Sequence, residues 1–476
     1  MKTNYLTVVL FLASLHFASA APPTTSAKPN VLFIAVDDLN NRLGCYGDSI
    51  VKTPNIDRLA ARGVRFDRAY CQFPLCNPSR SSFLSGRFPP TTQVTGNEKN
   101  PRDTLGDIKL LPEYFAAHGY FTAKAGKIPH GAFDSSVKWD AKDDEAPATE
   151  DDEKSVSKGK KGGGKKAVGR KAKNQGKIEA LTDVKLPDSV AWRALDVPDN
   201  ATSDGRSARH VVAFLEQAAK DRSRPFFIAV GFHKPHRPYE APRPYFAGYP
   251  TDKMPVATQP PQRHQEAPEI AYNGPPSDAN IPASQQRDAI AAYHACITFM
   301  DTQAGLVLDT LDRLGLTGNT IVVFASDHGY HLGEHGGMWR KMSLFEESAR
   351  VPLMIAAPGR KAGVSPRTVG LVDLFPTLTE LCGLSAPAGL EGVSLAPLLD
   401  NPQAEWKRPA LTFVTRKGDG LAQRVRTERW AFTAWPDGKF TLYDHDNDPR
   451  EFNNLAADSR YATTIAELSR HMTLKP

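Results

Sequence analysis

Cysteine and long apolar runs are both scarce in this chain. Only five of the 476 residues are cysteine, at positions 45, 71, 76, 296 and 382, without the close spacing of a disulfide framework. A small scaffold held together by disulfides is therefore excluded. The four cysteines other than Cys76 would form either two bridges or four buried thiols, and the wide spacing favours buried thiols. With 40% hydrophobic and 24% charged residues, the composition is that of an ordinary globular protein.

The one long apolar run lies at the start of the chain. Lys2 precedes the run at residues 6–17, which ends in the small-residue pattern Ala18-Ser19-Ala20. This arrangement predicts a signal peptide over residues 1–20 with cleavage near Ala20. A retained N-terminal anchor is the alternative, although the run is too short to span a bilayer comfortably. We therefore expect a secreted or periplasmic protein with no membrane attachment after cleavage.

The formal net charge of +6 is unevenly placed. Residues 158–177 are crowded with lysine and glycine, and residues 140–153 just before them are acidic. Opposed charge blocks of this kind predict a solvated low-complexity insertion, which we place at residues 139–180. Binding of a polyanion such as a sulfated glycan is the alternative interpretation. No zinc-finger, RRM or KH signature accompanies the lysines, so we expect no nucleic-acid partner.

Continuous apolar runs predict the fold of the main part of the chain. They occur at residues 31–36, 225–230 and 320–325, and helical spacing covers residues 289–314. Short apolar runs are typical of strands buried on both faces. Strands that alternate with helices favour an α/β fold, with a large mixed, mostly parallel sheet flanked by helices. We assign this domain to residues 28–400.

Polar residues follow each of these runs directly. Asp37-Asp38 comes after the first, Gly231-Phe232-His233 after the second and Asp327-His328 after the third. Open parallel sheets bind ligands at the carboxyl ends of their strands. Loops that are distant in sequence are therefore predicted to meet at one site.

The pattern changes near residue 400. Residues 430–435 and 439–443 alternate in polarity and are separated by Pro436-Asp437-Gly438, which is a hairpin signal. Residues 459–472 have helical spacing, with Ser459 as the expected cap. We therefore predict that residues 401–476 form a small antiparallel sheet plus a helix, packed on the main domain.

Residues 76–87 read Cys-Asn-Pro-Ser-Arg-Ser-Ser-Phe-Leu-Ser-Gly-Arg. Pro78 near the start and Gly86 near the end predict a short helix with Cys76 at its N-terminus. A helix N-terminus offers unpaired N–H groups and the positive end of the helix dipole, so it attracts anions. On this segment alone, a buried thiol beside a helix cap would be the better interpretation.

The segment resembles the modification signal of the formylglycine-dependent sulfatases, in the alkaline-phosphatase-like superfamily. Cys76, Pro78, Arg80 and Leu84-Ser85-Gly86-Arg87 match every element, and the resemblance covers residues 30–455. It implies that Cys76 is oxidised to formylglycine (3-oxoalanine) by a formylglycine-generating or anaerobic sulfatase-maturing enzyme. It also implies one Ca²⁺ ion, which suits hard oxygen ligands. The implied metal ligands are Asp37, Asp38, Cys76, Asp327 and His328.

Further positions resemble the iduronate-2-sulfatase-like branch. His328 stands where many sulfatases carry Asn or Gln, and two residues separate Lys127 from His130. His233 matches the active-site histidine of that branch. Gly333-Glu334-His335-Gly336 followed by Lys341 resembles its late loop, with one extra residue before the lysine, so the neighbouring Arg340 is the alternative to Lys341. The resemblance implies that Arg80 and Lys127 orient the formylglycine hydrate and that His233 and Lys341 face the bridging oxygen. His130 would take a proton from the second hydroxyl.

These resemblances imply hydrolysis of sulfate esters, with a sulfated, uronic-acid-containing polysaccharide fragment as the expected substrate. A phosphomonoester or phosphonate ester hydrolase of the same superfamily is one alternative. A non-catalytic glycan-binding protein is another, if Cys76 is not matured. Arg416, Arg424 and Arg426 are candidates for binding a carboxylate or second sulfate on the substrate, and surface solvation is their alternative role.

Overall fold

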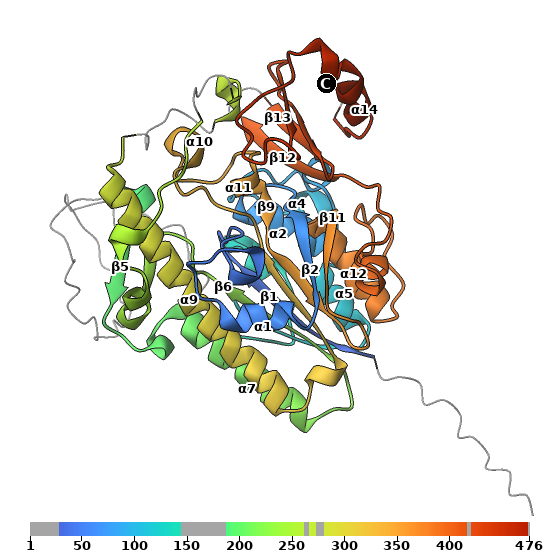
Figure 1. The fold of residues 1–476 in the computed structure, drawn as a ribbon. Helices are drawn as coiled ribbons and strands as arrows, with labels where there is room; N and C mark the ends of the chain where they lie inside the picture. The colour runs from blue at the N-terminus through green and yellow to red at the C-terminus, as the bar shows by residue number, and fades with distance from the viewer. Residues whose placement is uncertain (1–27, 144–186, 261–265, 273–279, 417–419, 475–476) are drawn as a thin grey trace, which may run out of the picture.

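A computed structural model describes residues 28–143, 187–260, 266–272, 280–416 and 420–474 (Figure 1). The predicted signal peptide lies outside these residues, and so do residues 144–180 of the predicted charged insertion. Within the described part, no helix is both long enough and apolar enough to cross a membrane. The predicted domain boundaries stay predictions.

The centre of the molecule is a nine-stranded sheet, most of whose strands run parallel. Two strands, β9 and β10, run against their neighbours. In spatial order the sheet contains β11 (Gly363–Gly370), β2 (Val64–Tyr70), β10 (Leu353–Ala356), β8 (Thr320–Ser326), β1 (Asn30–Val36), β6 (Phe226–Phe232), β3 (Phe121–Gly126) and β4 (Ala141–Lys142), with β9 (Arg350–Val351) paired to β2. Strands β1, β6 and β8 confirm the three predicted apolar strands.

Helices cover both faces of this sheet because its central strands are apolar on both sides. In β1, Leu32, Ile34 and Val36 belong to one hydrophobic cluster, whereas Val31 and Phe33 belong to another. The first face is covered by α1 (Pro54–Ala60), α7 (Ser203–Lys220) and α9 (Ala283–Arg313), and the second by α2 (Cys76–Ser85), α5 (Leu111–Ala117) and α12 (Leu374–Leu381) (Figure 1). The predicted α/β fold is confirmed, and α9 matches the predicted long helix.

Shorter elements connect these layers. They are α3 (Pro89–Thr92), α4 (Arg102–Leu105), α10 (Glu334–Gly337), α11 (Glu346–Ala349), α13 (Ala396–Asp400) and a small parallel pair formed by β5 (Trp192–Leu195) and β7 (Tyr239–Pro242). All five cysteines are free thiols, and only Cys45 is less than fully buried.

A four-stranded antiparallel sheet follows near the C-terminus. It contains β12 (Ala410–Arg416), β13 (Gly420–Arg426), β14 (Trp430–Ala434) and β15 (Phe440–Asp444). Strands β14 and β15 are the predicted hairpin, whereas the sequence analysis did not predict β12 and β13. The terminal helix α14 (Ala462–Ser469) is shorter than predicted. The expected cap was wrong, because Ser459 begins a 3-10 turn, Ser459–Tyr461, that is capped by the side chain of Asp458 and precedes α14.

The order of the central strands determines where the polar loops emerge. Strands β8, β1, β6 and β3 are neighbours and parallel, so their carboxyl ends lie along one edge. Backbone bonds extend the pairing past these ends: the N–H of Asp327 donates to Val36, and that of Lys127 donates to Gly231. Only glycine fits at residue 231, because a Cβ there would lie 1.9 Å from the carbonyl oxygen of Lys127.

Candidate active site

Cys76 is the first residue of α2, as predicted, and Gly86 ends this helix in a left-handed conformation with φ 66°. The Cys76 side chain is buried, with Sγ 3.3 Å from Nε2 of His328 and 3.2 Å from Nζ of Lys341. Burial, with the nearby charge of Asp37, raises the pKa of the Cys76 thiol to about 12. The unmodified side chain is therefore a neutral thiol at physiological pH and a weak nucleophile.

Three aspartates surround this thiol at the ends of β1 and β8. Asp37, Asp38 and Asp327 are all at most 1% exposed. The N–H groups of Asp38 and His328 both donate to Oδ1 of Asp327, at 3.3 and 2.9 Å. Asp38 has a left-handed backbone with φ 60°, which is uncommon outside glycine. The turn after β1 is thus bound directly to the turn after β8.

His328 turns the Nε2 atom of its ring toward the site, 3.3 Å from Sγ of Cys76. Its Nδ1 lies 2.9 Å from the carbonyl oxygen of Gly329, which can only accept, so Nδ1 carries the proton. Its Nε2 faces the aspartates and lies 3.3 Å from Oδ1 of Asp38. This is the tautomer in which an imidazole binds a metal ion.

Three cationic side chains neutralise the aspartates. The fully buried Arg80 places Nε 2.8 Å from Oδ2 of Asp327 and one terminal nitrogen 3.6 Å from Oδ1 of Asp37. Lys127 Nζ lies 2.6 Å from Oδ2 of Asp37. Lys341 Nζ lies 2.7 Å from Oδ1 of Asp38.

The neighbouring cationic side chains determine the ionisation of Asp37 and Asp38. Burial acts to raise the pKa of Asp37, but Lys127, His236 and Arg80 outweigh it and hold the pKa well below its usual range. The pKa of Asp38 is also lowered, because His236 and Lys341 outweigh its burial. Both side chains are therefore carboxylates at neutral pH.

The donor atoms of this cluster fit a divalent cation. Oδ1 of Asp37 and Oδ2 of Asp38 are buried and accept no hydrogen bond from any described residue. Such orphaned carboxylate oxygens are costly unless a cation satisfies them. One ligand atom each from Asp37, Cys76, Asp327 and His328 lies within 4.8 Å of the others. Four of the five predicted ligands therefore lie together, and the fifth, Asp38, forms an overlapping group with Asp37 and Cys76.

His130 and His233 stand beside the cluster as neutral side chains. Burial, with the charge of Lys127, lowers the pKa of each to about 3. Nδ1 of His130 is buried without a partner among the described residues. The loop of His233 is held by Asp204 in the first turn of α7, which accepts the N–H groups of His233 and Lys234 at 2.8 and 2.9 Å.

The structure adds His236, which the sequence analysis did not select. Its Nε2 lies 3.7 Å from Oδ2 of Asp38, and it forms a second possible ligand group with Asp37, Asp38 and Cys76. Burial lowers its pKa to about 3 even though Asp38 opposes the shift. The available signal was the pair of histidines in His233-Lys234-Pro235-His236, but spacing alone does not say which ring faces the aspartates.

The three C-terminal arginines are buried, so the prediction that they are solvated at the surface was wrong. Arg424 and Arg426 are buried and pair with Glu346, and Arg424 also pairs with Glu451. Arg416 is 9% exposed and donates to backbone carbonyls, among them that of Ile270. These bonds join the small sheet to the main domain. Arg426 also lines a pocket with Arg65 and Arg350, so its binding of a substrate anion stays a prediction.

Comparison with known proteins agrees with this geometry. The sulfatase family model matches residues 29–384, and the model of the N-sulphoglucosamine sulphohydrolase C-terminal region matches residues 333–475. Iduronate 2-sulfatase of Mus musculus is 36% identical over 425 residues, which are 79% of this chain and 72% of that protein. A sulfatase of Formosa agariphila is 33% identical over 466 residues, covering 93% and 85% of the two chains.

Solved structures also share the architecture. A phosphonate monoester hydrolase of Agrobacterium radiobacter superposes with a TM-score of 0.74, covering 93% of this chain and 94% of that one. The sequences are 23% identical, so this likeness shows the fold alone.

Arg80→Ala tests how strongly the site depends on its buried ion pairs. The change removes the guanidinium that neutralises the buried carboxylates of Asp327 and Asp37. We therefore expect the free energy of unfolding to fall by about 3–5 kcal/mol. The measurement is urea unfolding at pH 7. The control is Arg58→Ala, whose pair with Asp309 is exposed (42% and 61%) and should contribute less than about 1 kcal/mol. Equal losses in the two variants would contradict the argument.

Proposed function

This chain belongs to the sulfatase family and is a sulfuric ester hydrolase with an alkaline-phosphatase-like fold, and we propose that it desulfates a sulfated, uronic-acid-containing polysaccharide fragment. The observation that carries the proposal is the convergence of Asp37, Asp38, Asp327 and His328 on Cys76 at the start of α2. The substrate class is supported by the name of the iduronate 2-sulfatase relative, which is similar over most of this chain.

We infer that Cys76 acts as formylglycine, made by a formylglycine-generating or anaerobic sulfatase-maturing enzyme that supplies the oxidant. The raised pKa of the thiol supports this, since an unmodified Cys76 would have almost no thiolate for attack on an anionic ester. The hydrated aldehyde would supply an oxygen nucleophile with a second hydroxyl for release of sulfate, and one Ca²⁺ would supply a Lewis acid. Asp37, Asp38, Asp327 and His328 would hold this ion, together with residue 76.

The surrounding side chains fit complementary roles. Arg80 and Lys127 place positive charge beside residue 76 and would orient the hydrate. Lys341 Nζ, 3.2 Å from Sγ of Cys76, would face the bridging oxygen of the ester. His233 would also face the bridging oxygen. His236 is a second candidate for this role because it contacts Asp38. His130, neutral through its lowered pKa, can accept a proton from the second hydroxyl.

The substrate proposal is tested with a panel of esters. The protein matured in its native host should desulfate uronic-acid-containing glycan fragments faster than it hydrolyses phosphate or phosphonate monoesters. Cys76→Ser should lose turnover by several orders of magnitude and retain one sulfo group in its intact mass, because serine lacks a second hydroxyl. Sustained turnover by Cys76→Ser would overturn the mechanism. Faster hydrolysis of phosphonates, or glycan binding without turnover by matured protein, would favour the corresponding alternative function.

Maturation of Cys76 can be measured beside a built-in control. Trypsin cleavage after Arg68 and Arg80 releases a peptide that holds both Cys71 and Cys76. We expect Cys76 to appear as the aldehyde and to react with a hydrazide. Cys71, which directly follows β2, should stay a thiol that alkylates after unfolding. Two alkylated cysteines in catalytically active protein would refute formylglycine.

Calcium binding is predicted to stabilise the folded chain. At a Ca²⁺ concentration of about 100 times Kd the gain is about 2.7 kcal/mol, read as a rise in Tm. Asp38→Asn should lose most of that rise, because it removes a ligand oxygen and charge. The exposed Asp309→Asn should keep it, which controls for ionic strength. A Ca²⁺-induced rise of the same size in Asp38→Asn would exclude this site as the one that binds the ion.

A further inference from the structure

A closed loop lies between the last strand-end aspartate and Lys341. The N–H of His331 donates to the carbonyl of Arg340 at 3.0 Å, and the N–H of Gly333 donates to that of Met338 at 2.7 Å. Residues 331–340 therefore form a loop whose two ends are bonded together. Lys341 follows this closure directly, so its backbone position depends on the loop.

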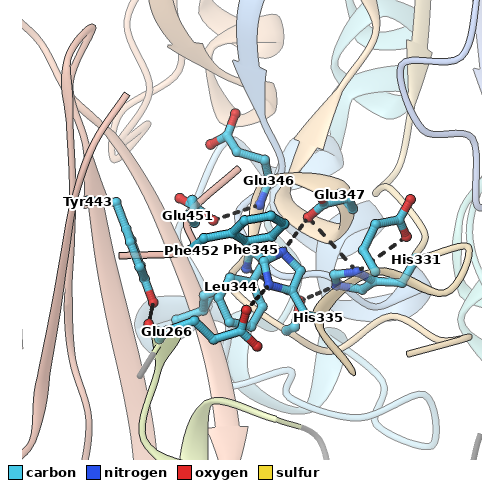
Figure 2. Close-up of polar contacts among 12 residues, drawn as sticks. Glu266, His331, His335, Leu344, Phe345, Glu346, Glu347, Tyr443, Glu451 and Phe452 are labelled. Atoms are coloured by element: carbon cyan, nitrogen blue, oxygen red, sulfur yellow. Dashed lines mark hydrogen bonds and ion pairs between the residues drawn. The ribbon is translucent and has the colours of Figure 1, made fainter. Parts of the chain in front are cut away.

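The tip of this loop is a fully buried histidine between two carboxylates (Figure 2). Nδ1 of His335 lies 3.3 Å from Oε2 of Glu266, and its Nε2 lies 3.2 Å from Oε2 of Glu347. A carboxylate only accepts, so both ring nitrogens donate and the ring is an imidazolium. Burial opposes this charge, but Glu347 and Glu266 outweigh it and raise the pKa of His335 to about 10.

The partners of His335 come from separate parts of the chain. The ring stacks on Phe345 with centroids 3.8 Å apart and planes 10° apart. Glu266 is held in turn, since its carbonyl accepts the hydroxyl of Tyr443 at 2.6 Å and its Oε1 accepts that of Tyr272 at 2.5 Å. The loop tip is thus fixed to the segment around Glu266 and, through Tyr443, to the C-terminal sheet, as Figure 2 shows.

The backbone at the tip needs these contacts. His335 has φ 50° and the next residue, Gly336, has φ 80°, and a non-glycine residue in this region costs about 1–3 kcal/mol. On the other side of Lys341, the N–H of Met342 donates to the carbonyl of Pro74 at 3.1 Å, next to the segment that carries Cys76. Lys341 is therefore held from both sides, by the loop and by residue 74.

We propose that His335 is a positioning residue, whose clamping between Glu266 and Glu347 fixes the loop and thereby holds Lys341 against Asp38 and Cys76. The proposal rests on the proposed role of Lys341 at the bridging oxygen. Loss of the imidazolium leaves the buried Glu266 carboxylate without its cation and removes the link to the partly exposed Glu347, which loosens the tip. Because the loop closes on Arg340, the displacement passes to the next residue, Lys341.

The test uses the dependence of the rate on the leaving group. An alcohol of high pKa needs help at the bridging oxygen, whereas a nitrophenolate leaves without it. His335→Gln and Lys341→Ala should therefore each lower kcat on a glycan sulfate on the order of 10²-fold and change kcat on nitrophenyl sulfate only slightly. In the Lys341→Ala background, His335→Gln should cause little further loss.

Hydrogen–deuterium exchange gives a readout that does not depend on activity. In His335→Gln, peptides that contain the N–H groups of His331, Gly333 and Met342 should exchange faster, and peptides of β1 should not. The matched control is Asp301→Asn, which weakens a buried carboxylate bonded to the N–H of Ile56 at 2.8 Å. This variant should lower Tm, and any change in kcat should be the same for the glycan sulfate and for nitrophenyl sulfate.

The possible outcomes separate this proposal from the function on which it rests. If Lys341→Ala itself shows no leaving-group effect, the role of Lys341 is wrong and the proposal for His335 falls with it. If Lys341→Ala shows the effect but His335→Gln slows both substrates equally, or adds its full loss in the double variant, His335 is only structural. Should His335→Gln not fold, Glu266→Gln removes one carboxylate of the clamp and must show the same pattern.

Discussion

The buried ion pairs of Arg80 are the interaction on which the rest of the site depends. Its guanidinium bonds Asp327 after β8, approaches Asp37 after β1 and donates to the carbonyls of Lys127 and Ile128 after β3. Ends of three strands thus share one cation that water does not reach. Carboxylates in such a place are stable only with a partner, so the position of each strand end is fixed by the same charge.

This arrangement follows from the sheet itself. The central strands must be apolar on both faces to pack between two helical layers, so their polar residues are confined to the strand ends. Parallel neighbours then bring those ends to one edge. Cys76 is the first residue of α2, so the positive end of this helix dipole adds positive potential at the site. The location of the site is therefore a consequence of topology, and its chemistry is a consequence of the side chains placed there.

Sequence patterns predicted the parts of the molecule that local physics determines. Apolar runs located β1, β6 and β8, and the Pro436-Asp437-Gly438 turn located the β14–β15 hairpin. Strand β13 was not predicted because it buries the polar Gln423 and the charged Arg424 and Arg426. The two arginines are neutralised by Glu346 and Glu451, which are distant in sequence. The same limit applies to the histidines: motif spacing named His233, but only tertiary packing shows that His236 lies against Asp38. Local sequence patterns do not show which residues of distant segments form ion pairs.

The balance of charge at the site explains why it would suit an anionic ester. Three buried aspartates face Arg80, Lys127 and Lys341, so the side chains alone nearly cancel. His130, His233 and His236 have lowered pKa values, so they are neutral and add no charge at neutral pH. A divalent cation would make the site positive without removing any of the carboxylates that hold it. Attraction for the substrate would then come from the ion, while Lys127 and Lys341 stay beside Asp37 and Asp38, close to residue 76.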